Sequence, residues 1–434
     1  MKKKKFLMLL IICVSIIVIE LFVMLIMYIN RERNISHVNS LNDIVKTNDG
    51  YVGVGISDFH NSDNVKMKTY EYTDDTTKEK QLIITTQSKI AKYDNNFQLK
   101  WEKTFDNPYD STFYDILKID NGFIVVGSYA KDLKQISANT RDALIIRYDN
   151  DGNIIWYKTY SVLSDTEFYK VIQDNDKLIV IGQSIYENME VGNHTTGGGI
   201  IVKYDMDGNQ LENNNYGGNK SGKFNDIVSV DDGYIVCGKD ATNYGIIVKF
   251  KKDFNRDEKD TNIISKKVVW QRTYSNTDYE GFTSMVKYKD TLYLAGAINI
   301  SNEKDKDGNP LFKYDAGIVA YNTNSKYLGN YSLGDNTHHL FNSIICDDEY
   351  LYVSAILDVD NKNVDSKSMI IKYQLTDIDK LNKNIIEKKV FDNDKSYLIS
   401  ELVNINNDLL YIGTANDNCK LLTGCDYQEF ISRY

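Results

Sequence analysis

The chain has 434 residues, of which 42% are hydrophobic, with 51 Lys or Arg against 61 Asp or Glu. Its 32 Tyr, 16 Phe and only 2 Pro are typical of packed β-sheets and exclude a disordered chain. Residues 41–434 carry 45 bases and 59 acids, which disfavours nucleic acid as a partner because this part of the chain cannot neutralise phosphates.

Residues 1–30 differ in composition from the rest. Four lysines at positions 2–5 precede an apolar run at residues 6–29, which as a helix would span about 36 Å, enough to cross a hydrocarbon layer of about 30 Å. No alanine occurs before Ala91, so the small-residue cleavage site of a signal peptide is missing. We therefore expect a single-pass transmembrane signal-anchor, with the lysines cytoplasmic and the remainder extracytoplasmic.

One pattern recurs seven times between residues 41 and 434. Seven apolar residues, here called anchors, are each followed eleven positions later by a small residue, and a bulky apolar residue, here called the plug, stands three positions before each anchor. A repeat of this length buries its apolar face against neighbouring copies. The anchors are Ile44, Ile116, Val171, Ile227, Met285, Ile344 and Leu402, and the small residues are Gly55, Gly127, Gly182, Gly238, Gly296, Ala355 and Gly413.

Each unit holds four short segments rich in Ile, Val, Tyr and Trp, which suit β-strands. Asp-Gly sequences at residues 150–153 and 206–209 join the third segment to the fourth, as in tight hairpins. We expect an all-β fold at residues 41–434, a β-propeller of seven four-stranded blades, preceded by one N-terminal transmembrane helix. Residues 31–40 are expected to be a linker or a strand that closes the last blade. An extra apolar run at residues 82–86 leaves six or eight blades open.

Three groups of residues are candidates for sites. Asp253, Asn255, Asp257 and Asp260 have spacing suited to calcium, but Glu258 stands where calcium loops use glycine, and a solvated charged loop is the alternative. Cys419 and Cys425 flank five residues and are candidates for a disulfide outside the cell. The adjacent His338 and His339 are expected to be solvated rather than to bind metal.

The segments IIRYDNDGNIIWYKTY at residues 145–160 and FYKVIQDNDKLIVIGQS at residues 168–184 resemble the repeat of bacterial surface β-propellers, including SBBP-type and PQQ-like repeat proteins. The resemblance covers about residues 41–434. It implies a propeller displayed on the cell surface without an assigned chemistry. It does not imply quinone binding, because the adjacent cysteines of quinoprotein dehydrogenases are absent.

Familiar catalytic motifs, including H-E-x-x-H, G-x-S-x-G, Walker sequences and C-x-x-C, do not occur. We expect a membrane-anchored extracytoplasmic binding or scaffold module whose partner is a protein or glycan at the cell surface. The alternatives are a cell-envelope enzyme, a glycan- or peptide-active hydrolase or lyase, and an assembly factor that would require a periplasm. The site is expected on the face that carries the loops between strands two and three of each unit. Three or more acids converging in one pocket there would favour the enzyme, and a flat aromatic face would favour docking.

Overall fold

The computed structural model describes residues 39–57, 60–61, 64–65, 68–73, 80–106, 109–132, 135, 140–162, 165–187, 195–216, 222–240, 242–255, 267–275, 277–299, 314–334, 339–357, 367–375, 378, 381, 384–391, 395–405, 408–417 and 427–434. Within this part of the chain, no helix is long and apolar enough to cross a membrane. The predicted span at residues 6–29 lies outside it, so the transmembrane helix stays a prediction.

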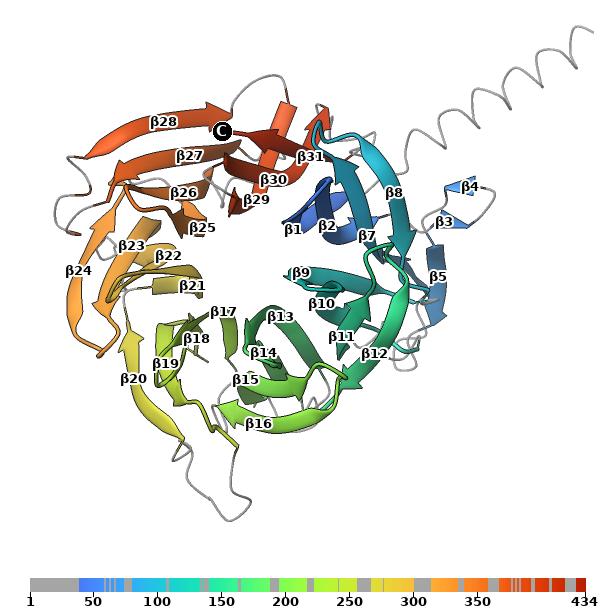
Figure 1. Ribbon diagram of the computed structural model, residues 1–434, viewed down its shortest axis with the longest axis horizontal. Helices are drawn as coiled ribbons and strands as arrows, with labels where there is room; N and C mark the ends of the chain where they lie inside the picture. The colour runs from blue at the N-terminus through green and yellow to red at the C-terminus, as the bar shows by residue number, and fades with distance from the viewer. Residues whose placement is uncertain are drawn as a thin grey trace, which may run out of the picture.

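Seven antiparallel sheets stand around a central axis as the blades of a propeller (Figure 1). Blade one contains β1 (Ser40–Thr47), β2 (Gly50–Ser57), β7 (Gln87–Asp94) and β8 (Leu99–Thr104). Blade two contains β9 (Ser111–Ile119), β10 (Gly122–Tyr129), β11 (Asp142–Tyr148) and β12 (Ile154–Tyr160). Blade three contains β13 (Asp165–Asp174), β14 (Lys177–Glu187), β15 (Thr195–Asp205) and β16 (Gln210–Tyr216). In each blade the first strand lies nearest the axis.

The remaining blades repeat this order. Blade four contains β17 (Lys223–Val230), β18 (Gly233–Lys239), β19 (Gly245–Lys251) and β20 (Val268–Tyr274). Blade five contains β21 (Thr277–Tyr288), β22 (Thr291–Asn299), β23 (Tyr314–Asn322) and β24 (Tyr327–Ser332). Blade six contains β25 (Leu340–Cys346), β26 (Tyr350–Leu357), β27 (Lys367–Gln374) and β28 (Ile385–Phe391). Blade seven has three described strands, β29 (Lys395–Ile405), β30 (Asp408–Asp417) and β31 (Tyr427–Arg433).

The seven-bladed prediction is confirmed, and the extra apolar run at residues 82–86 does not add a blade. Most of this run lies in β6 (Lys80–Thr85), which pairs with β5 (Lys68–Thr73) in a separate two-stranded ribbon between β2 and β7. A shorter ribbon joins β3 (His60–Asn61) to β4 (Asn64–Val65). Residue 40 begins the inner strand of blade one, and residues 1–38 lie outside the described part, so the predicted closing strand is not tested.

The repeated plug and small residues face each other across the first two strands of every blade. Phe113 of β9 pairs with Gly127 of β10, and a Cβ on Gly127 would lie 2.0 Å from the carbonyl oxygen of Thr112. The close approach of the two strands therefore requires a residue without a large side chain. Blade six meets the same requirement with Ala355 opposite Phe341.

The ring closes between blades seven and one. Ser400 of β29 donates a hydrogen bond of 2.6 Å to the carbonyl oxygen of Leu41 in β1. Glu429 of β31 accepts a bond of 2.6 Å from the Tyr93 hydroxyl and forms an ion pair with the buried Lys89, both in β7. An apolar cluster fills the space between these blades with Leu41, Ile44, Tyr51, Ala91, Tyr93, Leu410 and Ile412. Closure thus uses the same kinds of contact as the other junctions, apolar packing with hydrogen bonds from the inner strand.

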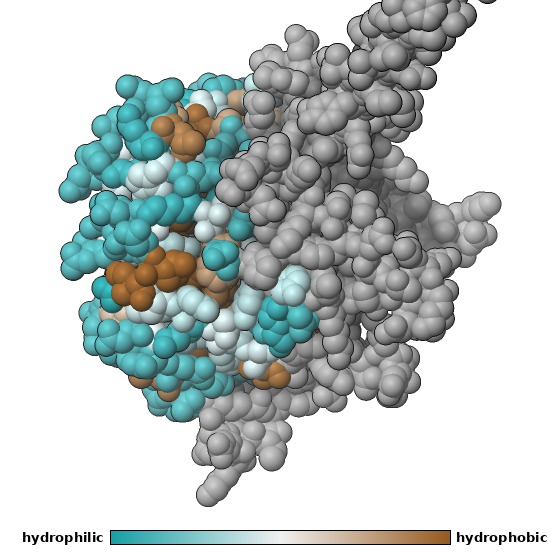
Figure 2. Space-filling view, turned by 90° about the vertical axis from the view of Figure 1, so that its right-hand side faces the viewer, coloured by the Kyte–Doolittle hydropathy of each residue, from teal (hydrophilic) through white to brown (hydrophobic). Residues whose placement is uncertain are grey.

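The coloured part of the rim on the side seen in Figure 2 is mostly polar, with scattered apolar patches. The outer strands of five blades expose an aliphatic residue at one equivalent position, and Ile155 in β12 is 52% exposed. The others are Leu211, Val269, Leu328 and Ile386. These residues are dispersed around the ring, as single exposed apolar side chains commonly are.

Candidate functional site

Every inner strand carries a β-bulge at the same place. The register of the first two strands shifts between the plug and the residue before the anchor in all seven blades. A bulge sets two residues of one strand opposite one residue of its partner and redirects their side chains. We call the residues two and one positions before the anchor the first and second bulge residues.

The bulge residues line a cavity on the propeller axis. The cavity volume is about 90 Å³. All of its lining residues are bulge residues, contributed by six blades: Asn42, Asp43, Tyr114, Asp115, Tyr169, Lys170, Asn225, Asp226, Thr283, Ser284 and Glu401. The repeat thus brings Asn42 and Glu401, which are 359 positions apart in the chain, to the same cavity.

Second bulge residues hold neighbouring blades together by accepting hydrogen bonds from the next anchor. Asp43 accepts from the backbone N–H of Ile116 at 3.1 Å, and Asp115 accepts from that of Val171 at 2.8 Å. Three further junctions have the same bond. The side chains of Asp226, Ser284 and Ser343 accept from the backbone N–H groups of Met285, Ile344 and Leu402, respectively. These bonds satisfy buried backbone donors and fix the spacing of the inner strands.

Among the described residues, this bond is not seen at the two junctions whose second bulge residue is Lys170 or Glu401. An ammonium group has no acceptor, so Lys170 cannot accept from Ile227. The N–H groups of Ile227 and Ile44 donate instead to their own preceding carboxylates, Asp226 and Asp43, both at 2.8 Å. Lys170 and Glu401 are thereby left facing the cavity.

First bulge residues form a second set of bonds between blades. In five blades an Asn, Thr or Ser donates to the carbonyl oxygen of the next plug, as Asn225 does to Phe282 at 2.8 Å. The other four bonds are Asn42 to Phe113, Thr283 to Phe341, Asn342 to Ile399 and Ser400 to Leu41. Blades two and three have Tyr114 and Tyr169 at this position. Their rings meet edge to face at 5.1 Å between centroids, and the Tyr114 hydroxyl donates to Glu167 at 3.0 Å.

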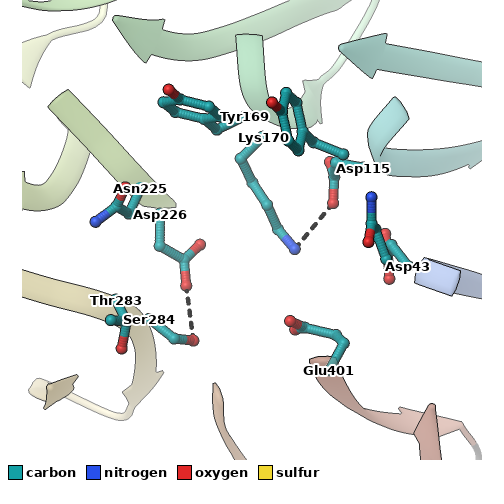
Figure 3. A pocket seen from close by; sticks show the side chains of 11 residues that line it. Asp43, Asp115, Tyr169, Lys170, Asn225, Asp226, Thr283, Ser284 and Glu401 are labelled. Atoms are coloured by element: carbon teal, nitrogen blue, oxygen red, sulfur yellow. Dashed lines mark hydrogen bonds and ion pairs between the residues drawn. The ribbon is translucent and has the colours of Figure 1, made fainter. Parts of the chain in front are cut away.

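Lys170 extends into the middle of the cavity, with Asp226 on one side, Asp43 and Asp115 on the other, and Glu401 opposite (Figure 3). Its Nζ lies 2.9 Å from a carboxylate oxygen of Asp115. Burial disfavours the charged ammonium, but the carboxylates of Asp115, Glu401, Asp43 and Asp226 outweigh burial and hold the pKa of Lys170 well above its ordinary value. Lys170 is therefore a fixed cation and not a nucleophile.

Three of the four carboxyl groups around Lys170 are shifted toward their neutral forms. Burial raises the pKa of Glu401 to about 7, with Asp226 and Asp115 adding to the rise and Lys170 opposing it. Burial and the neighbouring Asp115 raise the pKa of Asp43 well above its ordinary value, and burial also raises the pKa of Asp226. Burial thus favours the neutral forms of these three groups, and Glu401 changes its charge near neutral pH.

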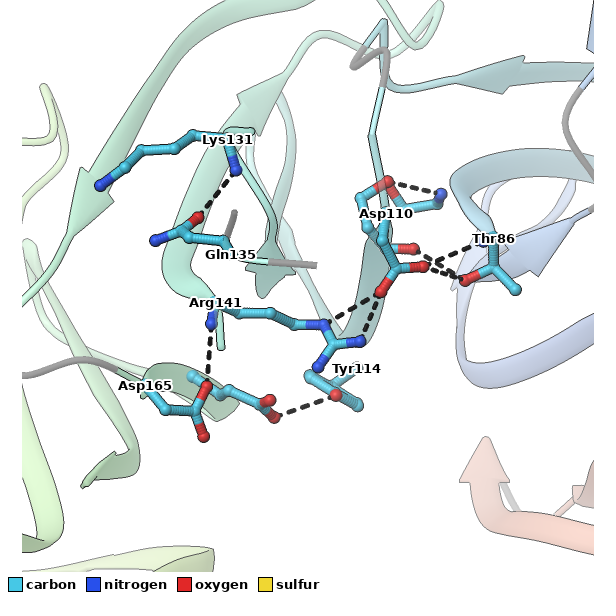
Figure 4. A network of polar contacts seen from close by, with 10 residues as sticks. Thr86, Asp110, Tyr114, Lys131, Gln135, Arg141 and Asp165 are labelled. Atoms are coloured by element: carbon cyan, nitrogen blue, oxygen red, sulfur yellow. Dashed lines mark hydrogen bonds and ion pairs between the residues drawn. The ribbon is translucent and has the colours of Figure 1, made fainter. Parts of the chain in front are cut away.

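A polar network adjoins the cavity on one face of the propeller (Figure 4). This face, here called the link face, carries the loops between second and third strands and the links between blades. Arg141, just before β11, pairs through its guanidinium with Asp110 of the link to blade two, and its backbone N–H donates to Asp165 of blade three at 3.0 Å. Asp110 also accepts from the backbone N–H of Thr86 at 2.9 Å. The network therefore joins the first three blades at the link face.

Tyr114 connects this network to the cavity, because it lines the cavity and donates to Glu167 in β13. Burial and the neighbouring Glu167 raise the pKa of Asp165 to about 6. Polar side chains of blades one to three thus extend from the link face to the axial cavity. The sequence predicted a site on this face, among the loops between second and third strands, but many residues of these loops lie outside the described part of the chain.

The predicted calcium residues are only partly placed. Asp253 is exposed and pairs with Lys267 at 2.6 Å, Asn255 is exposed, and Asp257 and Asp260 lie outside the described residues. Calcium binding here stays a prediction, which calorimetry with calcium can test. In the part of the chain that the structure describes, no three His, Cys, Asp or Glu side chains gather to hold a metal.

The other candidates have mixed outcomes. Cys419 and Cys425 lie outside the described residues, so the disulfide is not tested. His338 also lies outside them, whereas His339 is buried and not solvated, because it directly precedes β25, where the chain enters the ring.

Reasoning from the sequence missed the axial cavity, although a signal was present. The bulge residues form a polar pair between two apolar positions in every unit, as Tyr114 and Asp115 do between Phe113 and Ile116. This pair breaks the alternation of a regular strand and so marks the bulge.

Comparison with protein-family models finds no match, and comparison with curated proteins also finds none. Solved structures of similar shape include a protein of unknown function from Bacteroides caccae, with a TM-score of 0.40 and 11% identity over 70% of this chain and 90% of that chain. Another is the hydrazine synthase of Kuenenia stuttgartiensis, with a TM-score of 0.47 and 8% identity over 81% and 92%. A third is Semaphorin 1b of Drosophila, with a TM-score of 0.45 and 7% identity over 87% and 85%. Likeness this distant carries no inference about function. The sheet topology itself establishes the β-propeller, while the resemblance to surface-propeller repeats stays a prediction.

Proposed function

We propose that the chain is a membrane-tethered, extracytoplasmic binding module. Residues 6–29 anchor it, and the propeller presents the link face of blades one to three to a protein or glycan of the cell envelope. The excess of acids over bases in residues 41–434 supports a partner that carries positive or neutral groups. The resemblance to bacterial surface propellers supports display outside the membrane.

The structural role of the cavity carboxylates favours binding over catalysis. Asp43, Asp115 and Asp226 each accept a hydrogen bond from the backbone of the next blade, so these carboxylates are built into the ring. The cavity between them, at about 90 Å³, is smaller than the roughly 300 to 1,000 Å³ of ordinary small-molecule sites. This geometry suits the recognition of a single small group better than the turnover of a sugar or peptide.

A hydrolase or lyase is the second candidate, and a specific feature favours it. Four carboxyl groups converge on the cavity, and the pKa of Glu401 at about 7 is typical of a general acid. This candidate requires that glycan or peptide cleavage by the full-length protein is lost in Glu401→Gln while binding persists. Unchanged cleavage in that variant would exclude Glu401 as the acid.

The tether and its orientation can be tested by cysteine labelling of the full-length protein in intact cells. Lys158 is exposed on β12, so Lys158→Cys should react with a membrane-impermeant maleimide. The matched variant Lys3→Cys should react only after the membrane is permeabilised. The reverse pattern would overturn the proposed location.

Binding can be tested with the full-length protein in detergent against cationic peptides, neutral glycans and a DNA duplex. We expect binding to a cationic peptide or a glycan but not to DNA. Binding to a cationic peptide should weaken as salt rises, because the attraction is electrostatic. Arg141→Ala removes a positive charge from the link face and frees the carboxylate of Asp110 from its ion pair, so it should strengthen this binding. Tight DNA binding would contradict the proposal.

A further inference from the structure

We propose that the axial cavity binds one small primary ammonium group beside Lys170. The group can come from a free amine or from a lysine side chain of a partner. This inference depends on neither the membrane tether nor the partner of the link face, so each can fail without the other.

The charges in the cavity are unbalanced. Four of its lining residues are carboxyl groups, and Lys170 is its one cationic side chain. Lys170 forms an ion pair with Asp115, and among the described residues no ion pair reaches Asp43, Asp226 or Glu401. Asp115 is only 3% exposed and Asp43 only 8%. Carboxylates so buried are costly without a cation, and a ligand cation would supply the missing charge.

The cavity already holds one ammonium group, that of Lys170. Its Nζ lies 2.9 Å from Asp115, and its side chain is still 29% exposed because the cavity around it is open. An ammonium has three N–H donors, and carboxylates accept at several sites. The same set of acceptors therefore has room for a second group of this kind.

Blades two and three depart from the repeat at the first bulge position. Five blades use the first bulge residue to bond the next blade, but blades two and three place Tyr114 and Tyr169 there. The two tyrosines forgo that bond and line the cavity. Aromatic rings beside a cation stabilise it. Tyr114 bonds the next blade through Glu167 instead, so this departure from the repeat changes the junction bond and also adds aromatic walls to the cavity.

An ammonium fits this cavity better than a metal ion. In the described part of the chain, no three acidic, histidine or cysteine side chains are close enough to share a metal. Oxygens of Asp43, Asp115 and Asp226 already accept backbone N–H groups, which fixes them at the spacing of the blades. Hydrogen-bond donors tolerate that spacing, whereas divalent metals require closer convergence.

The test uses the full-length protein in detergent, with methylammonium chloride as the probe. We expect a saturable rise in melting temperature above that given by sodium chloride or tetramethylammonium chloride at equal ionic strength. Half-saturation should be on the order of 10 mM, near the limit for a ligand of two heavy atoms. Protons should be released on binding at pH 7, since the cation displaces those held by the carboxyl groups. Glu401→Gln should weaken binding about tenfold and reduce the proton release.

A rescue experiment gives a matched comparison between two lysines. Lys170→Met removes the internal ammonium, so methylammonium should restore part of the lost melting temperature and bind about tenfold more tightly than to the wild type. Lys249→Met is the control, because Lys249 is also buried, at 4% exposed, and pairs with Asp232 at 2.7 Å, but lies outside the cavity. Its loss of stability should not respond to methylammonium.

Two arms distinguish the source of the group. Stronger stabilisation by Nα-acetyl-lysine amide than by methylammonium supports a partner's lysine, and the reverse supports a free amine. A wild-type protein that responds to methylammonium no more than to sodium overturns the inference, whatever Lys170→Met shows. A response that survives unchanged in Glu401→Gln also overturns it.

Discussion

Blades two and three differ from the other five at the axis. In those five blades, the first bulge residue is a small polar side chain that bonds the next blade, as Asn225 bonds Phe282. In blades two and three, Tyr114 and Tyr169 stand at this position, and Lys170 interrupts the second set of bonds. The comparison teaches that in a repeat the shared positions hold the ring, while departures from the pattern mark where the surface is specialised.

The largest effect is expected from breaking the regular set of bonds at Asp226. Its carboxylate accepts from the N–H groups of Ile227 and Met285 and from the Ser284 hydroxyl. Asp226→Ala leaves these donors without a partner, so the free energy of unfolding should fall by about 3 kcal/mol, or the chain should fail to fold. Asp226→Asn keeps an acceptor and should lose about half as much. Equal stability of Asp226→Ala and the wild type in urea unfolding would show that these bonds do not hold the ring.

A smaller, pH-dependent effect is expected at Glu401, in the cavity opposite Lys170. Its pKa rises from 4.5 to about 7 on folding, so the neutral form favours the folded state. The stability that this group contributes is present below about pH 4.5 and is lost as the pH rises toward 7. Glu401→Gln should therefore match the wild type near pH 4.5 and exceed it at pH 8 by about 2 kcal/mol, allowing for solvent in the cavity. Thermal unfolding across this pH range measures the difference, and parallel curves would contradict it.

The smallest effects compare first bulge residues directly. Asn225→Ala removes the bond to the Phe282 carbonyl and should lower the free energy of unfolding by about 1 kcal/mol. Tyr114→Phe loses only its bond to Glu167 and should cost less than half as much. Both variants are compared by urea unfolding of the full-length protein. A larger loss in Tyr114→Phe would assign the tyrosine to the structure rather than to a site.

The fold followed from the sequence because its signal is local and repeated. A plug and a small residue such as Phe113 and Gly127 lie fourteen positions apart and face each other across a single hairpin, so their spacing fixes the register. Seven copies of this hairpin leave few alternatives to a closed ring.

The site did not follow, because its residues meet only through ring closure. Asp43 and Glu401 line one cavity although almost the whole chain separates them. The pair Tyr114 and Asp115 marks a bulge within one strand, but only the curvature of the assembled ring directs it toward the axis. The calcium and disulfide candidates depend on loops outside the described residues, where spacing along the chain does not determine spacing in three dimensions.

The position of β1 as the innermost strand of blade one decides how a tethered propeller would stand on its membrane. The chain enters β1 from the link face, close to the propeller axis. A linker of residues 30–38 would therefore start near the axis and reach at most about 30 Å. A propeller held by so short a linker would turn its link face toward the lipid. The opposite face, with the hairpin turns between strands one and two, would point away from the membrane. Molecules embedded in the same membrane would then reach Arg141 and the link-face end of the propeller axis more readily than molecules that arrive from the medium.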